Sequence, residues 1–377
     1  MKRFFAVFLG LCVVLSFTGC GGTEGNDGLG NGWVPERTMD LRYATQFQVE
    51  YYTGGYKLIT LGDGSRFLVI PKGCERPKRI HRDIVSLYQP IENIYLAATA
   101  AMCLFDGMDR LDAIRLSSLK EEDWYIENAR TAMENGGILY AGKYSAPDYE
   151  LIMESGCKLA VESTMIGHAA EEKEKLEDLG IPVLIDQSSH EPHPLGRTEW
   201  LKLYAALLNE EEKAENVFSE QTAFLEEVSA EKPTGKTVAF FQITSAGFVV
   251  ARKSGDYVSK MIDLAGGKYV FDHLGDPNKV TSTVTIEMET FYDTARTADY
   301  IIYNGSIGGG VRNLEEFLDL NPLLAEFKAV KDGNVWCTAE NMFQETLQLG
   351  QMIRDIHCIL TEDETELSEL EFIYRLR

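Results

Sequence analysis

The chain lacks the motifs of several well-known enzyme classes. It contains no GxSxG elbow, no HExxH helix, no P-loop and no GxGxxG fingerprint, and the glycine run at 305–310 does not have the spacing of the last. No nucleophile, base and orienting group can be assembled into a hydrolytic site. We therefore predict no catalytic residues and no enzyme, with a surface-anchored hydrolase as the alternative.

Basic residues and closely spaced cysteines are also scarce. Lys and Arg total 36 against 59 Asp and Glu, for a formal net charge of -23. No Lys/Arg cluster is long enough to form a basic face, so we predict no nucleic-acid partner. An anionic ligand must then be held by a local group of cations against the overall field.

The seven cysteines include no CxxC pair, which indicates neither a zinc site nor a dense disulfide scaffold. We predict no metal site and mostly free thiols.

The first twenty residues have the features of an export signal. Lys2 and Arg3 precede an apolar run at 4–15, and Leu15-Ser-Phe-Thr-Gly-Cys20 follows it. That last run resembles the bacterial lipoprotein cleavage box, which implies that Cys20 is acylated. The Gly-rich stretch at 21–32 is typical of a flexible tether. We expect a signal at 1–19, a tether at 20–36 and an extracytoplasmic protein anchored to the membrane through Cys20; the alternative is a plain secretory signal.

The remaining sequence alternates strand and helix patterns, which predicts an α/β protein with parallel sheets. A length of 377 residues favours about two domains. We predict an N-terminal hairpin or meander at 41–50, 56–61 and 66–70. For the first lobe we predict strands at 83–87, 109–116, 158–162 and 182–186 and helices at 95–105 and 148–155. For the second lobe we predict strands at 237–242, 247–251, 300–303 and 334–337 and helices at 257–265, 314–318 and 345–360.

A long helical stretch at 197–230 separates the two halves. Asn209 with Glu212 has the pattern of an N-cap and capping box, which predicts one helix ending near Leu208 and a longer one at 210–230. That helix would span roughly 30 Å. We therefore expect a first lobe at 37–208, a connecting helix at 209–230 and a second lobe at 231–377.

Five motifs in register resemble the class III periplasmic binding proteins, which serve ABC importers of ferric siderophores, haem and cobalamin. They are PKRI at 77–80 with IVSL at 84–87 and FDGMDRL at 105–111, PDYELI at 147–152, LGIPVL at 179–184, IDLAGGKYVF at 262–271, and FKAVKDGNVW at 327–336. The resemblance implies two α/β lobes joined by one long helix, a ligand in the cleft between them, and small lobe movement. It further implies a monomer without a cofactor of its own, whose ligand is an iron- or cobalt-containing chelate. A binding protein for a free metal ion is the alternative.

The candidate ligand-binding residues are those that follow the predicted strands, because ligands of open α/β sheets bind beyond the carboxyl ends of the strands. Aromatic faces with scattered cations suit a bulky anionic chelate, and Arg197 is the foremost candidate. The full set is Tyr88, Gln89, Trp124, Tyr125, Thr164, His190, His193, Arg197, Gln242, Arg252, Tyr257, Asn304, Phe343 and Gln344.

Two histidines three residues apart, His190 and His193, could ligate a metal. Pro192 and Pro194 oppose the helix that would place both on one face. We therefore expect these histidines to line or cap the cleft.

Two glutamates are candidates for contact with the membrane permease. The resemblance implies that one glutamate on each lobe pairs with permease arginines, and the matching positions are Glu150 in PDYELI and Glu289 in IEMETFY, with Glu287 as the alternative to Glu289. Such charge-assisted pairs give register and orientation.

Overall fold

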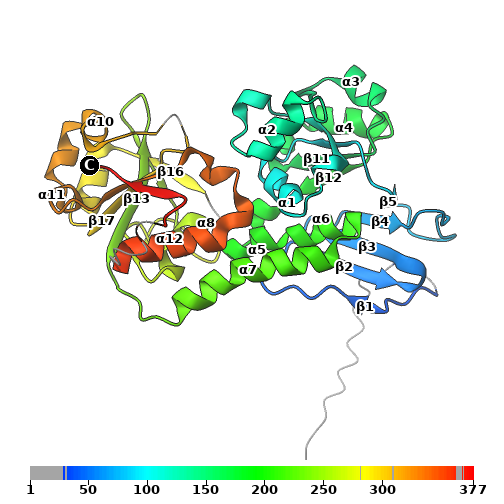
Figure 1. Cartoon of the computed structure of the whole chain (residues 1–377), viewed down its shortest axis with the longest axis horizontal. Coiled ribbons are helices and arrows are strands. Elements are labelled where there is room, and N and C mark those ends of the chain that lie inside the picture. The colour runs from blue at the N-terminus through cyan, green and yellow to red at the C-terminus, as the bar shows by residue number, and fades with distance from the viewer. Residues whose placement is uncertain (1–28, 30–31, 281, 308–309, 362–366, 368) are drawn as a thin grey trace, which may run out of the picture.

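The computed structural model describes residues 29, 32–280, 282–307, 310–361, 367 and 369–377. The predicted signal, Cys20 and most of the tether lie outside these residues. Figure 1 shows two α/β lobes, one formed by the first half of the chain and one by the second, above a layer of helices. No helix within the described ranges is long and apolar enough to cross a membrane.

The chain begins with a separate five-stranded sheet. Strands β1 to β4 pair antiparallel, and β5 adds parallel to β4, with Arg66 opposite Ile84 and Ile70 opposite Tyr88. The strands are β1 (Arg37–Thr38), β2 (Phe47–Tyr52), β3 (Tyr56–Leu61), β4 (Arg66–Ile70) and β5 (Ile84–Tyr88). The strand predicted at 83–87 is present as β5, and it completes this N-terminal sheet.

The first lobe contains a parallel sheet in the order β12-β11-β6-β7-β8. Its strands are β6 (Ile94–Leu96), β7 (Ile114–Ser117), β8 (Leu139–Tyr140), β11 (Leu159–Ser163) and β12 (Val183–Asp186), and a small ribbon is formed by β9 (Gly142–Lys143) and β10 (Ala146–Pro147). Its helices are α1 (Met102–Gly107), α2 (Glu127–Glu134), α3 (Tyr149–Glu154) and α4 (Ala170–Asp178).

The predicted helix at 95–105 is wrong in its first half, because β6 occupies Ile94–Leu96 and the α-helix begins at Met102. Strand β6 lies between β11 and β7 and is buried throughout. A short apolar run of this kind has no periodicity that separates a buried strand from a buried helix.

The second lobe contains a seven-stranded mixed sheet in the order β16-β14-β13-β17-β18-β19, with β15 beside β13. Its strands are β13 (Thr237–Ile243), β14 (Val249–Arg252), β15 (Lys268–Tyr269), β16 (Thr283–Ile286), β17 (Tyr300–Tyr303), β18 (Val335–Thr338) and β19 (Ile373–Arg375). Its helices are α8 (Tyr257–Leu264), α9 (Met288–Ala295), α10 (Leu314–Asp319), α11 (Lys328–Lys331) and α12 (Leu349–Thr361). Strands β13, β17 and β18 run parallel at its centre.

Three consecutive helices join the lobes: α5 (Pro194–Glu199), α6 (Leu201–Leu208) and α7 (Glu211–Ser229). Every residue of α6 is buried, whereas α7 buries a single stripe. On that stripe Ala214 belongs to the hydrophobic core of the first lobe, and Phe218 and Leu225 belong to that of the second. Helix α7 is therefore packed into both cores, and Figure 1 shows it running beneath both lobes.

The predicted capping box at Asn209 is wrong. Asn209 ends α6 in the left-handed conformation, with φ 62, and the N-cap of α7 is Glu210, which makes no side-chain capping bond. Asparagine tolerates this backbone region better than most residues. Its side-chain oxygen accepts hydrogen bonds from Lys57 Nζ at 2.8 Å and from Gln89 Nε2 at 3.0 Å, which joins this corner to the N-terminal sheet.

Short 3₁₀ segments complete the fold: η1 (Thr53–Gly55), η2 (Thr99–Ala101), η3 (Leu111–Ala113), η4 (Glu121–Asp123), η5 (Thr164–His168), η6 (Ser188–His190), η7 (Pro322–Glu326), η8 (Glu340–Phe343) and η9 (Thr346–Gln348). Segments η5 and η6 follow β11 and β12 and reach the space between the lobes. Four cysteines within the described ranges are free thiols, namely Cys74, Cys103, Cys157 and Cys337.

Candidate functional site

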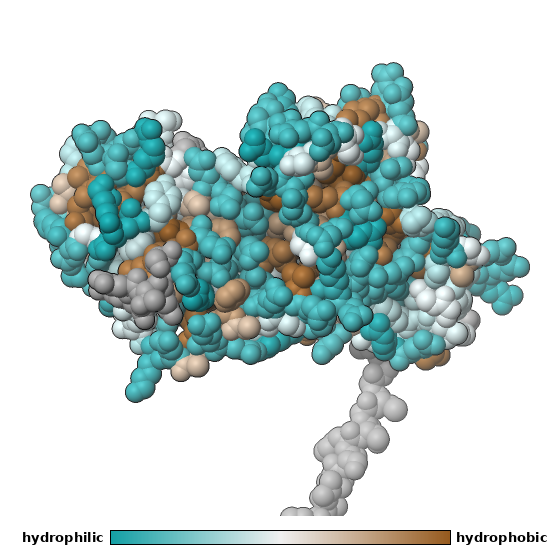
Figure 2. Space-filling model, in the orientation of Figure 1, coloured by the Kyte–Doolittle hydropathy of each residue, from teal (hydrophilic) through white to brown (hydrophobic). Residues whose placement is uncertain are grey.

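A cleft of about 570 Å³ lies between the two lobes. Its first-lobe wall comes from η5, η6 and α5, and its second-lobe wall from the end of β14, the start of α8 and the loops that carry Ile307 and Phe343. The lining residues are Thr164, Met165, Ser189, His190, Glu191, Arg197, Arg252, Asp256, Tyr257, Val280, Ser282, Ile307 and Phe343. Figure 2 shows a mainly hydrophilic surface whose outline dips between the two lobes.

Arg197 lies in this cleft. It belongs to α5, which begins at Pro194, a residue whose fixed φ suits the first helical position. The guanidinium carbon lies 4.1 Å from the centre of the Tyr257 ring on the opposite lobe. Its Nε is enclosed and has no hydrogen-bond partner among the described residues. A buried donor without a partner is costly, so this group is available to an anionic ligand.

Arg252 supplies a second cation at the end of β14. It is 8% exposed, its Nη1 lies 3.5 Å from Asp256 Oδ2, and its guanidinium lies 5.3 Å from the centre of the Phe343 ring. Asp256 also accepts a hydrogen bond from the Val258 N–H at 2.9 Å and so caps α8. Burial raises the pKa of the Asp256 carboxyl, although both arginines oppose this.

The other carboxylate of the cleft wall, Glu191, is engaged elsewhere. Its oxygens accept hydrogen bonds from Thr45 and Gln46 of the N-terminal segment and from Trp200 Nε1 at 2.8 Å. Burial raises the pKa of Glu191 and these bonds oppose the rise. Neither carboxylate makes a hydrogen bond or ion pair with Arg197 among the described contacts, so Arg197 is a cleft cation whose guanidinium remains open to a ligand.

The structure brings six of the fourteen predicted ligand-binding residues together in the cleft: Thr164, His190, Arg197, Arg252, Tyr257 and Phe343. The seven lining residues outside the predicted set are Met165, Ser189, Glu191, Asp256, Val280, Ser282 and Ile307. Asp256 could have been found from its position before the apolar helix that begins at Tyr257, since Asp is a preferred N-cap.

Tyr88 and Gln89 lie outside the cleft. They line a different pocket with Cys157, Lys158 and Pro182, and Gln89 Nε2 donates a hydrogen bond to the Leu207 carbonyl at 2.9 Å. The physical reason is the placement of β5, which carries both residues into the N-terminal sheet.

The aromatic pair after β7 is also separate from the cleft. Trp124 is 2% exposed and donates from Nε1 to Ser117 Oγ at 3.2 Å, so it is a core residue. Gln344 accepts a hydrogen bond from the Tyr125 N–H and donates one to the Asp123 carbonyl, both at 2.8 Å. Gln344 thus links the second lobe to a loop of the first.

Gln242 and Asn304 bond to each other, with 3.1 Å between Asn304 Nδ2 and Gln242 Oε1. Ser306 Oγ donates to the Asn304 oxygen at 2.6 Å. Asn304 is 2% exposed and does not line the cleft. This pair supports the loop that carries Ile307 to the cleft wall.

His193 is the N-cap of α5. Its Nδ1 accepts the Leu195 N–H at 3.1 Å, and its ring stacks on Tyr43 with 4.3 Å between ring centres. Burial lowers the pKa of His193 to about 4, so the imidazole is neutral at pH 7. Within the described part of the chain no three His, Cys, Asp or Glu side chains form a group that could hold a metal ion.

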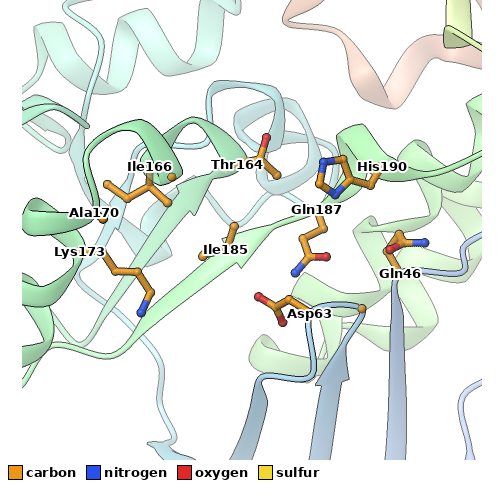
Figure 3. Close-up of a pocket in the computed structure, with 11 residues that line it drawn as sticks. Gln46, Asp63, Thr164, Ile166, Ala170, Lys173, Ile185, Gln187 and His190 are labelled. Atoms are coloured by element: carbon orange, nitrogen blue, oxygen red, sulfur yellow. The ribbon is translucent and has the colours of Figure 1, made fainter. Parts of the chain in front are cut away.

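A second pocket of about 460 Å³, which we call the side pocket, lies between the N-terminal sheet and the first lobe (Figure 3). Its lining residues are Gln46, Gly62, Asp63, Thr164, Ile166, Gly167, Ala170, Lys173, Ile185, Gln187 and His190. Thr164 and His190 therefore line both the side pocket and the cleft.

Glu150 and Glu289 are exposed and occupy the first turns of α3 and α9, one on each lobe. Glu287, the alternative to Glu289, is the N-cap of α9 and is also exposed. Acidic side chains in the first turn of a helix complement its dipole. In these exposed positions the carboxylates can contact another protein.

Comparison with known proteins identifies a family model that matches this chain and solved structures that share its fold. The family model described as periplasmic binding protein matches residues 141–341. An uncharacterized lipoprotein of Methanocaldococcus jannaschii is 25% identical over 350 residues, covering 86% of this chain and 82% of the relative. A second uncharacterized lipoprotein of that organism is 28% identical over 311 residues, covering 78% of this chain and 76% of the relative.

Solved structures resemble this fold over most of their length. The periplasmic haem-binding protein HutB of Vibrio cholerae has a TM-score of 0.57 at 17% identity and covers 70% of this chain and 97% of its own. The TroA-like periplasmic binding protein FepB of Veillonella parvula has a TM-score of 0.59 at 13% identity and covers 77% of this chain and 96% of its own. At these identities the likeness shows the two-lobed fold.

Proposed function

The chain belongs to the periplasmic binding protein family, as its sequence motifs led us to expect, and on that premise we propose that it captures an anionic metal chelate in the inter-lobe cleft and delivers it to an ABC importer. The observation that carries the proposal is the guanidinium of Arg197, whose Nε has no hydrogen-bond partner among the described residues and which lines the same cleft as a second arginine, Arg252. In a chain with a formal net charge of -23, two cations gathered in one cleft favour a negatively charged ligand.

The ligand class follows from the rest of the lining. The aromatic rings of Tyr257 and Phe343 offer flat apolar contact, and guanidinium groups match carboxylate or catecholate oxygens through paired N–H donors. Both features suit a ferric siderophore or haem, with cobalamin as a further candidate. Proteins of similar fold include ones named for binding haem and vitamin B12, which supports this range.

The proposal includes a membrane anchor and a permease. We propose that Cys20 carries the lipid, in keeping with two relatives that are named lipoproteins. We propose that Glu150 and Glu289, exposed on separate lobes, meet arginines of the importer. The protein acts as a monomer that binds its ligand and does not transform it.

Ligand titration tests the proposal. The purified protein would be titrated with ferric enterobactin, a ferric trihydroxamate, haem and cyanocobalamin while its melting temperature and Trp fluorescence are followed. A bound chelate should stabilise the fold by about 2.7 kcal/mol at a hundredfold excess over its Kd and should be recovered unchanged. No response to any of the four, or chemical conversion of one of them, would overturn the proposal.

A further inference from the structure

The side pocket adjoins the cleft. Thr164 of η5 and His190 of η6 belong to the loops that follow β11 and β12, and each lines both spaces. Thr164 Oγ1 and Ser189 Oγ lie 3.4 Å apart, which holds the two loops together at the boundary. A ligand in the cleft beside His190 therefore lies next to the side pocket.

The lining of the side pocket fits a neutral chain. Ile166, Ala170 and Ile185 provide apolar contact. The charged groups are already engaged, since Lys173 Nζ pairs with Glu177 at 2.7 Å and Asp63 Oδ1 accepts two hydrogen bonds from Ser65. Asp63 is exposed and has no cation within ion-pair distance among the described residues, so the charge left in this pocket is negative and disfavours a second anionic group there.

One buried polar group in the side pocket has no partner. Gln187 is 4% exposed, and its carboxamide makes no hydrogen bond to any described residue. Figure 3 shows its side chain projecting between His190 and Asp63. A carboxamide both donates and accepts hydrogen bonds, and that of Gln187 faces the space of the side pocket with both capacities unused by the described residues. An amide group of a ligand could accept a hydrogen bond from the Gln187 NH₂ group and donate one to its carbonyl oxygen.

The outer wall of this pocket comes from the N-terminal sheet. A Cβ added at Gly62, between β3 and β4, would lie 2.5 Å from Gln46 Oε1 and 3.3 Å from Gln187 Oε1, so glycine allows these amides to approach the turn. Gln46, Gly62 and Asp63 precede residues 141–341, which match the family model. The outer wall of the side pocket thus lies outside the matched part of the chain, and the rest of its lining lies within it.

We propose that the side pocket binds a neutral, amide-bearing arm of the same chelate whose anionic core lies in the cleft, with Gln187 as its polar contact. This inference rests on the proposed function and narrows the ligand to a chelate with a pendant arm.

Two ferric tris-catecholates of equal charge test this inference by isothermal titration calorimetry. One is formed from catechol, and the other from N-propyl-2,3-dihydroxybenzamide, which adds an amide and a short apolar chain. The wild-type protein should bind the armed complex about tenfold more tightly, because burial of the propyl group outweighs the cost of ordering it.

Ala170→Trp should abolish this preference by filling the side pocket from an exposed position, with the affinity for the bare complex unchanged. Glu174→Trp is the matched control, since residue 174 is exposed on the same helix and does not line the pocket. Gln187→Met should reduce the preference severalfold by removing the amide contact. Equal wild-type affinities, or a preference that survives in Ala170→Trp, would overturn the inference while leaving the proposed function intact. If neither complex binds, the inference is overturned, whereas the proposed function is decided separately by the titration with the four chelates.

Discussion

Replacing Arg197 by glutamine removes the cation that the cleft leaves unpaired. In the folded protein this guanidinium contacts the Tyr257 ring at 4.1 Å, and its Nε lacks a hydrogen-bond partner among the described residues. The loss of the cation–π contact is offset by relief of the unsatisfied donor, so the free energy of unfolding should change by no more than about 1 kcal/mol. The variant should therefore fold normally.

Binding should respond much more strongly than folding. A hydrogen bond to a charged group contributes about 1.5–3 kcal/mol, which corresponds to an increase in Kd of roughly tenfold to 150-fold. Arg197→Lys should give an intermediate loss, because lysine keeps the charge but not the paired planar donors.

The assay is calorimetric titration with ferric enterobactin, alongside urea unfolding of each variant. Arg82→Gln is the control, since it removes the same charge from an exposed position outside the cleft. If Arg197→Gln binds as tightly as Arg82→Gln, the anion site is not where the structure places the unpaired guanidinium, and the reasoning is refuted.

Three further predictions concern docking and stability. Glu150→Lys with Glu289→Lys should leave chelate affinity intact and stop uptake in cells that carry the importer; uptake equal to wild type would exclude these glutamates as contacts. Burial raises the pKa of Glu162 to about 8, and both of its oxygens lack partners among the described residues, so the folded state holds a proton that the unfolded state loses above its ordinary pKa near 4.5. Wild-type stability should therefore fall relative to Glu162→Gln between pH 5 and pH 8, by about 1.4 kcal/mol per pH unit, and a constant difference in urea unfolding would contradict this. Glu199→Ala should destabilise the fold by about 3–5 kcal/mol, because this fully buried carboxylate accepts the backbone N–H groups of residues 42–44; a change under 1 kcal/mol in chemical unfolding would show that those bonds contribute little.

Much of the architecture could be predicted from local pattern. The strands at Tyr56–Leu61, Arg66–Ile70 and Tyr300–Tyr303 match the expected bounds because each is a β-branched and aromatic run between turn residues. The helix α7 at Glu211–Ser229 also follows its 3.6-residue periodicity. Local pattern locates the strand β5 but does not determine which sheet it joins, because strand pairing depends on tertiary contacts.

The ligand-binding residues could be predicted where a single rule holds, namely that residues at the ends of strands line the cleft. Thr164, Arg252 and Tyr257 follow strand ends, and such residues converge on a cleft between two α/β lobes. The rule fails for Trp124, whose loop folds back so that the indole enters the core, and for Gln344, which bridges the lobes through a 3₁₀ turn. Loop conformation decides those positions, and no local pattern encodes it.

The side pocket could not be predicted from sequence at all. It exists because the turn at Gly62 meets Gln187, two segments that are distant in the chain. Neither segment carries a recognisable motif. Only the packing of the N-terminal sheet against the first lobe brings them together.

Crystal structures of the protein with and without ferric enterobactin would test the central claim most directly. The chelate should lie in the inter-lobe cleft, with its anionic oxygens within hydrogen-bond distance of Arg197 and Arg252. The two lobes should keep their relative orientation, because α7 is one continuous helix packed into both cores. A chelate bound elsewhere, or a wide closure of the lobes around it, would contradict this account.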